Sequence, residues 1–84
     1  MHSFLNDPMF LAEQKLGRLA LEFRRSRDTE TRQSIVDQYE KAVKDLISTG
    51  TWDRVPPPED QLPDEVMPQT FFEYWDNRAN DAGV

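Results

Sequence analysis

Five of the six prolines in this 84-residue chain lie between positions 56 and 68. Proline removes a backbone donor and clashes with the preceding helical turn, so no long helix can run through that region. The sixth, Pro8, stands where a helix can begin, because the first helical residue needs no partner for its N–H, and Asp7 can cap that start. The long helices are therefore confined to the segment between Pro8 and Gly50.

That segment has the apolar spacing of two amphipathic helices, which we expect at about 8–26 and 29–49. Apolar residues recur at steps of three and four in the first, at Met9, Ala12, Leu16, Leu19 and Phe23. They fill one face of the second, at Ile35, Val36, Tyr39, Ala42, Val43, Leu46 and Ile47. Either Asp28 or Thr29 can cap the second helix, and Gly50 can end it in a left-handed conformation. Two helices of similar length with a short connection predict an antiparallel hairpin within residues 1–50.

Residues 51–84 form an acidic, proline-rich arm. They carry eight acidic and two basic residues, whereas residues 1–50 carry eight of each, so the net charge of −6 belongs to the arm. The run Pro56-Pro57-Pro58 predicts a stiff polyproline II spacer. We expect the apolar residues that follow to be intermittent anchors; these are Leu62, Val66 and Met67.

A short aromatic helix is expected near the end of the arm, at about 70–78. Thr70 and Glu73 have the spacing of a capping box, in which the two side chains bond each other's backbone N–H groups. The expected fold is therefore all-α: an antiparallel two-helix hairpin with an extended proline-rich C-terminal arm that ends in a short helix.

The hairpin alone leaves apolar surface uncovered, because each helix has an apolar face wider than one neighbour can cover. We expect a second copy to complete a four-helix bundle, so that the protein is a homodimer. The alternative is that the arm folds back over the hairpin. Gly17 lies inside the first helix with Ala20 one turn away. These two small residues leave a depression on the helix surface, where another segment could approach closely. A surface glycine without such a role is the other interpretation.

The first candidate site consists of five aromatic residues in the arm: Trp52, Phe71, Phe72, Tyr74 and Trp75. Aromatic side chains are the largest single contributors to burial, so we favour the interpretation that these rings close the open side of the hairpin or dimer. The alternative is a partner-binding motif whose rings are anchors and whose acidic surroundings steer it to a basic surface.

The second candidate site consists of four arginines around the helical connection, which are candidate anion contacts: Arg24, Arg25, Arg27 and Arg32. Guanidinium groups match phosphate oxygens in geometry. However, Glu22, Asp28 and Glu30 lie among them, and arginines near a helix C-terminus also complement its dipole. We therefore favour a solvated helix end over a nucleic-acid site.

Composition excludes several classes of function. There is no cysteine and a single histidine, His2, so a zinc site built from these residues, a thiol nucleophile and a Ser-His-Asp triad are not expected. No catalytic residue, metal or cofactor is predicted, and neither is a secretory signal or a membrane span.

These observations predict a small, non-catalytic cytoplasmic protein that acts through protein–protein contacts as an adaptor, assembly factor or inhibitor. Its expected partners are a second copy of itself and an unidentified protein. The alternative is a nucleic-acid-linked regulator, which would bind through the Arg24–Arg32 group or mimic nucleic acid through the acidic arm. We do not expect nucleic acid to be the ligand, because the chain is acidic overall.

Overall fold

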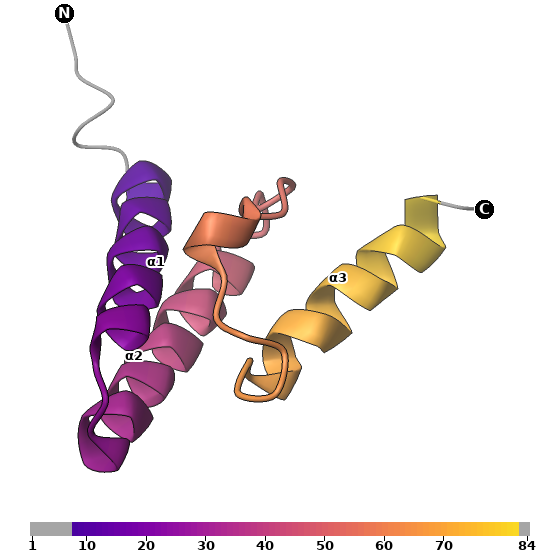
Figure 1. Cartoon of the computed structure of the whole chain (residues 1–84). Helices are drawn as coiled ribbons and strands as arrows, with labels where there is room; N and C mark the ends of the chain where they lie inside the picture. The colour runs from indigo at the N-terminus through magenta and orange to yellow at the C-terminus, as the bar shows by residue number, and fades with distance from the viewer. Residues whose placement is uncertain (1–7, 83–84) are drawn as a thin grey trace, which may run out of the picture.

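Two antiparallel helices, α1 (Pro8–Arg25) and α2 (Thr29–Ser48), lie side by side and are joined by residues 26–28 (Figure 1). The computed structural model describes residues 8–82, with side chains for residues 9–78. Within those residues, the chain also forms a 3-10 turn, η2 (Pro58–Asp60), and a third helix, α3 (Gln69–Ala82). The described part of the chain contains helices and no strand, which confirms the predicted all-α class.

The two hairpin helices begin at the predicted residues, and each ends one residue earlier than expected. Asp28, not Thr29, caps α2: its carboxylate accepts a hydrogen bond from the backbone N–H of Thr31 at 2.8 Å and one from the Thr31 hydroxyl at 2.9 Å. Gly50 follows with a φ of 74°, the left-handed conformation expected of a helix stop. Asp7, the expected cap of α1, lies outside the described residues.

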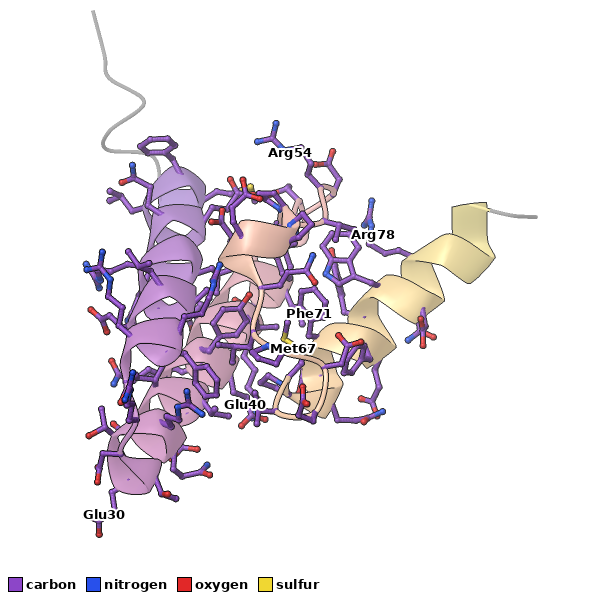
Figure 2. All side chains as sticks on the ribbon, viewed as in Figure 1. Glu30, Glu40, Arg54, Met67, Phe71 and Arg78 are labelled. Atoms are coloured by element: carbon purple, nitrogen blue, oxygen red, sulfur yellow. The ribbon has the colours of Figure 1, made fainter. Side chains whose placement is uncertain are left out.

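The core lies between the two hairpin helices and the inner side of the arm. The hairpin contributes Leu16, Leu19, Ala20, Phe23, Ile35, Tyr39, Ala42, Val43 and Leu46. The arm contributes Trp52, Leu62, Met67 and Phe71. Figure 2 shows Met67 and Phe71 in the space between the hairpin and α3. The arm therefore folds back and covers the hairpin within one chain.

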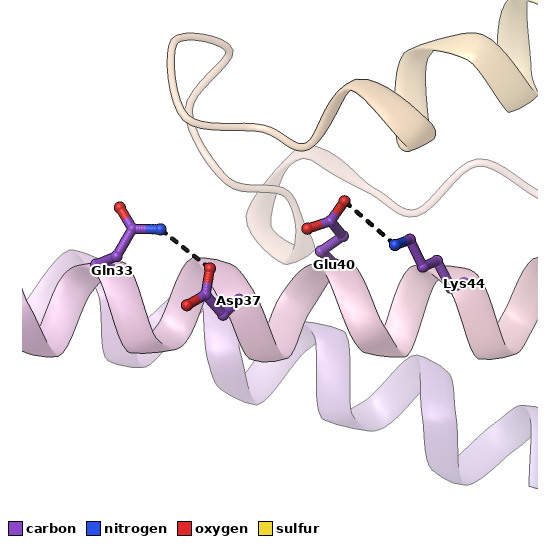
Figure 3. Close-up of polar contacts among 4 residues, drawn as sticks. All are labelled: Gln33, Asp37, Glu40 and Lys44. Atoms are coloured by element: carbon purple, nitrogen blue, oxygen red, sulfur yellow. Dashed lines mark hydrogen bonds and ion pairs between the residues drawn. The ribbon is translucent and has the colours of Figure 1, made fainter.

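The exposed side of α2 is lined with polar pairs one turn apart (Figure 3). The Gln33 side-chain amide donates a hydrogen bond to the Asp37 carboxylate at 3.0 Å, and Lys44 lies 3.6 Å from the Glu40 carboxylate. Pairs of this kind stabilise a helix by about 0.2–0.5 kcal/mol each, so they support α2 without fixing its place in the fold.

The proline run is not one continuous polyproline II segment, contrary to the prediction. Pro57 is extended, with φ −64° and ψ 159°, but Pro58 is already the first residue of η2. The backbone N–H of Asp60 donates to the Pro57 carbonyl at 2.8 Å, and that of Gln61 donates to the Pro58 carbonyl at 3.1 Å. Proline suits the first position of such a turn because its missing donor is not needed there.

The third helix differs from the prediction at both ends. It begins at Gln69, so Thr70 is the second helical residue and the predicted capping box is wrong. The first turn is instead closed by the Phe71 N–H, which donates to the Pro68 carbonyl at 3.0 Å. The helix also continues four residues beyond position 78, to Ala82, because the sequence has no glycine or proline between Gln69 and Ala82 to stop it.

Candidate functional site

The five aromatic candidates form one cluster that joins the start of the arm to α3. Trp52 is fully buried, and its ring stacks on Tyr74 at a centroid distance of 5.5 Å. It also meets Trp75 edge to face at 4.8 Å and Phe71 at 6.3 Å. The Tyr74 hydroxyl donates a hydrogen bond to the Trp52 carbonyl. Trp52 and Phe71 are therefore enclosed in the fold, whereas Phe72, Tyr74 and Trp75 keep partial exposure.

Packing against neighbouring rings, rather than hydrogen bonding, positions the indole rings of Trp52 and Trp75. The Nε1 atoms of Trp52 and Trp75 are both buried, and neither has a hydrogen-bond acceptor among the described residues. Their surroundings are other aromatic rings, which offer N–H groups only weak interactions. The ring contacts therefore tie the start of the arm to α3.

The four candidate arginines do not form one surface. Arg24 and Arg32 line a single groove, while Arg25 lines a separate shallow hollow beside Ile35. Arg27 is exposed in the connection between α1 and α2. Sequence proximity thus grouped side chains that the hairpin turn separates.

The groove lies where the end of α1, the start of α2 and residues 63–66 of the arm meet. It has a volume of about 490 Å³, and we call it the arginine groove. It is lined by Phe23, Arg24, Arg32, Pro63, Glu65 and Val66. Its floor is apolar, since Phe23 is buried and Val66 is partly buried against the core, and its rim carries charges of both signs.

The two arginines of the groove have different hydrogen-bonding states. Both terminal nitrogens of Arg24 donate to the Glu59 carbonyl, Nη1 at 3.0 Å, so this side chain holds η2 against α1. The Arg32 side chain donates from Nε to the Ser26 carbonyl at 2.7 Å. Its guanidinium carbon lies 4.6 Å from the centre of the Phe23 ring, a cation–π distance. The Nη1 and Nη2 atoms of Arg32 have no partner within residues 8–82, so Arg32 is an oriented cation with unused donors.

Arg24 and Arg32 were among the candidate residues predicted from the sequence, whereas the other residues of the groove were not. Phe23 was assigned to the apolar face of α1 and Val66 to the anchors of the arm, and Pro63 and Glu65 were not singled out. The pairing of Phe23 with Arg32 spans the helical connection. The sequence pattern that could have predicted this contact is an aromatic residue near the end of one helix followed by an arginine in the first turn of the next.

Tyr39 and Asp28, whose pKa values are shifted, belong to contacts that hold the fold. Burial raises the pKa of Tyr39, and the nearby Asp60 carboxylate raises it further. The Tyr39 hydroxyl donates to the Asp60 carbonyl at 2.6 Å, which joins α2 to η2. The hydrogen bonds from Thr31 lower the pKa of Asp28 below its ordinary value of 3.8. The pKa shift of Tyr39 is thus explained by its packing in the core, and that of Asp28 by its role as a helix cap.

Within the described residues, no three His, Cys, Asp or Glu side chains are grouped so that they could hold a metal ion. None of the helices in this part of the chain has the length and hydropathy needed to cross a membrane. The chain matches no protein-family model, no curated protein and no solved structure.

Proposed function

We propose that this protein is a small, non-catalytic cytoplasmic protein that acts through protein–protein contacts, as an adaptor, assembly factor or inhibitor. The observation that carries the proposal is the arginine groove, where Arg32, oriented and with two unused Nη donors, lies beside the apolar side chains of Phe23 and Val66. A cation next to apolar side chains, open to solvent, is typical of sites that anchor a partner's side chain. The proposed cytoplasmic location is compatible with the lack of cysteine, since disulfides are typical of oxidising compartments.

The alternative, a nucleic-acid-linked role, has weaker support. Binding a nucleic-acid backbone requires several cations that face successive phosphates. Arg24 is occupied by the Glu59 carbonyl, Arg25 faces a different hollow, and Glu65 lies on the rim of the groove itself. Of the two arginines in the groove, Arg32 is the one whose Nη atoms have no hydrogen-bond partner within residues 8–82.

The homodimer remains a proposal with a defined surface. Because the arm covers the inner side of the hairpin, we propose that a second copy would use the outer side of α1, where Leu11 and Leu21 are 48% and 45% exposed. Sedimentation equilibrium of the wild type and of Leu21→Gln tests this. A dimer that the substitution weakens supports the proposal, and a species with the mass of one chain over the whole concentration range contradicts it.

The main experiment captures binding proteins from the native cell with the full chain immobilised. Arg32→Glu reverses the charge in the groove, and Arg25→Glu is the matched control, because it makes the same change in the neighbouring hollow. We expect quantitative mass spectrometry to show proteins that the wild type and Arg25→Glu retain and Arg32→Glu loses. Melting curves of the three chains establish that each is folded.

Treating the extract with nuclease separates the two functions. Protein–protein contact predicts that capture survives the treatment. Capture that nuclease abolishes would favour the nucleic-acid alternative, and capture that is equal for all three chains would contradict any role for the arginine groove.

A further inference from the structure

The chemistry of the arginine groove indicates which kind of partner it can hold. We propose that it binds an acidic peptide segment, in which a carboxylate side chain neighbours an apolar side chain. This inference rests on the proposed protein–protein function and names the class of partner. It is carried by three features: the state of Arg32, the apolar floor and the charges on the rim.

Arg32 supplies the position for the carboxylate. The Nε bond to the Ser26 carbonyl and the contact with the Phe23 ring fix the plane of its guanidinium, and the side chain is half-buried. The two Nη atoms are left without partners in the described structure. A planar guanidinium can donate two parallel hydrogen bonds to one carboxylate. Because the donor is already oriented, binding costs little side-chain entropy.

The apolar floor supplies the position for the neighbouring side chain. Phe23 lies beneath the Arg32 guanidinium, and Val66 and Pro63 also line the groove. The volume of about 490 Å³ lies toward the lower part of the range for ligand pockets. It suits two or three side chains of a peptide, so an apolar residue next to the acidic one would be buried against Val66.

The rim limits how much negative charge the groove accepts. Glu65 lines the groove, and Asp64 lines the adjoining hollow, where Arg24 is directed to the Glu59 carbonyl. The chain also has a net charge of −6. One carboxylate at Arg32 is therefore favoured, whereas a polyanion would place further charges against Glu65 and Asp64. This charge pattern selects a peptide with an isolated acidic residue over nucleic acid.

A selection from random dodecapeptides displayed on phage tests the inference without assuming a partner. The full wild-type chain and the full Arg32→Glu chain are used as parallel baits. We expect the wild type to enrich peptides with an aspartate or glutamate beside an apolar residue, and Arg32→Glu to lose that enrichment. Equal enrichment on both baits, or no acidic preference on the wild type, would overturn the inference.

The affinity of one selected peptide then locates the contact. Fluorescence anisotropy with the labelled peptide should show binding at least about tenfold weaker for Arg32→Gln and changed less than about twofold for the control Arg25→Gln. Glu65→Gln removes a like charge from an exposed position and should tighten binding a few-fold without affecting folding. If neither Arg32→Gln nor Glu65→Gln changes the affinity for the peptide, the proposal is contradicted. Glu65→Gln keeps the test valid even if Arg32→Gln folds poorly.

Two further readouts separate this inference from its alternatives. Addition of the peptide should shift the NMR signals of the Val66 methyl groups and the Phe23 ring, and shifts confined to other residues would overturn the site. An oligothymidylate that displaces the peptide in an Arg32-dependent way would show that nucleic acid is the ligand. If acidic peptides fail to bind while capture from cells still depends on Arg32, this inference fails and the protein–protein function stands.

Discussion

Among the described residues, nine buried hydrophobic side chains come from the two long helices of the hairpin. In the described part of the arm, the buried core residues are spread over twenty residues with little regular structure between them; they are Trp52, Leu62, Met67 and Phe71. The hairpin thus distributes its packing over many positions, and the arm concentrates its packing in a few large residues. Loss of Trp52, the largest fully buried side chain, should therefore cost more than the loss of any one side chain of the hairpin.

The two regions also satisfy their backbone groups differently. Helices bond their own carbonyls, whereas an irregular segment must find other donors. Side chains donate the hydrogen bonds to several backbone carbonyls of the arm. Arg24 and Tyr39 of the hairpin donate to the carbonyls of Glu59 and Asp60. Tyr74 of α3 donates to the Trp52 carbonyl. The arm is therefore held to the hairpin by specific polar contacts as well as by burial.

The largest effect is expected for Trp52→Ala. Trp52 is fully buried and contacts three rings of α3, so its removal leaves a cavity at the base of the arm. We expect the free energy of unfolding to fall by about 3–5 kcal/mol, measured by urea denaturation and circular dichroism. Small domains have only about 5–15 kcal/mol in total, so α3 should detach or the chain unfold.

Val55→Ala is the matched control within the arm, because Val55 is 52% exposed. Its expected effect is below about 0.5 kcal/mol. If Trp52→Ala cost no more than this control, the arm could not be held by its large anchors, and the contrast with the hairpin would fail.

The sequence predicted the hairpin well because its signals are local. Pro8 and Asp28 mark the two starts, Gly50 marks the stop, and the spacing of the apolar residues gives the buried faces. The arm was predicted less well, since its structure depends on contacts with distant residues. Pro58 forms a turn that lies against α1, and no local pattern around Thr70 signals that α3 begins one residue earlier.

The arginine groove was only partly predictable for the same reason. Arg24 and Arg32 could be singled out by residue type, but their different states depend on the Glu59 and Ser26 carbonyls, which the fold brings to them. Sequence spacing carries no information on which arginine keeps unused donors. Contacts between segments distant in the chain decide this.

A second test compares two half-buried rings on α3. Trp75 contacts Trp52 and Tyr74, each at 4.8 Å between ring centres, whereas the ring contact of Phe72 is with Phe71 at 5.9 Å. We expect Trp75→Ala to cost about 3 kcal/mol and Phe72→Ala less than that, by thermal and urea unfolding. Equal and negligible effects would show that this face of α3 is not part of the core and would favour its role as a partner-binding surface.

A third test uses alkaline pH to weaken the contact of Tyr39 with the arm. Tyr39→Phe removes the hydrogen bond to the Asp60 carbonyl and should cost about 0.5–1.5 kcal/mol at neutral pH. Burial raises the pKa of folded Tyr39 above its ordinary value of 10.0, so the unfolded chain releases this proton first. Wild-type stability should therefore fall as the pH rises above about 10.

The Tyr39→Phe chain is also the control for that pH dependence. It keeps every lysine and the other tyrosine, so the difference between the two chains isolates the Tyr39 hydroxyl. Urea denaturation at a series of pH values should give a steeper loss for the wild type above about pH 10. Parallel curves would show that the Tyr39 hydroxyl is not buried against the arm.

The smallest effect on stability is expected for a substitution of Gly17, at the depression on the surface of α1 where the arm touches this helix. A Cβ atom at this position would lie 2.8 Å from Oδ1 of Asp60, so the arm of the same chain occupies the space. Gly17→Ala gains helix propensity of about 0.5–1 kcal/mol but forces the Asp60 carboxylate, the far end of a flexible side chain, to move, which should offset part of that gain. In an Asp60→Ala background the obstacle is absent, and the same substitution should stabilise the chain by about 0.5–1 kcal/mol. The four chains form a double-mutant cycle, measured by urea denaturation. A gain that is identical in both backgrounds would mean that Asp60 does not rest on α1 in solution, and hairpin and arm would then be independent at this point.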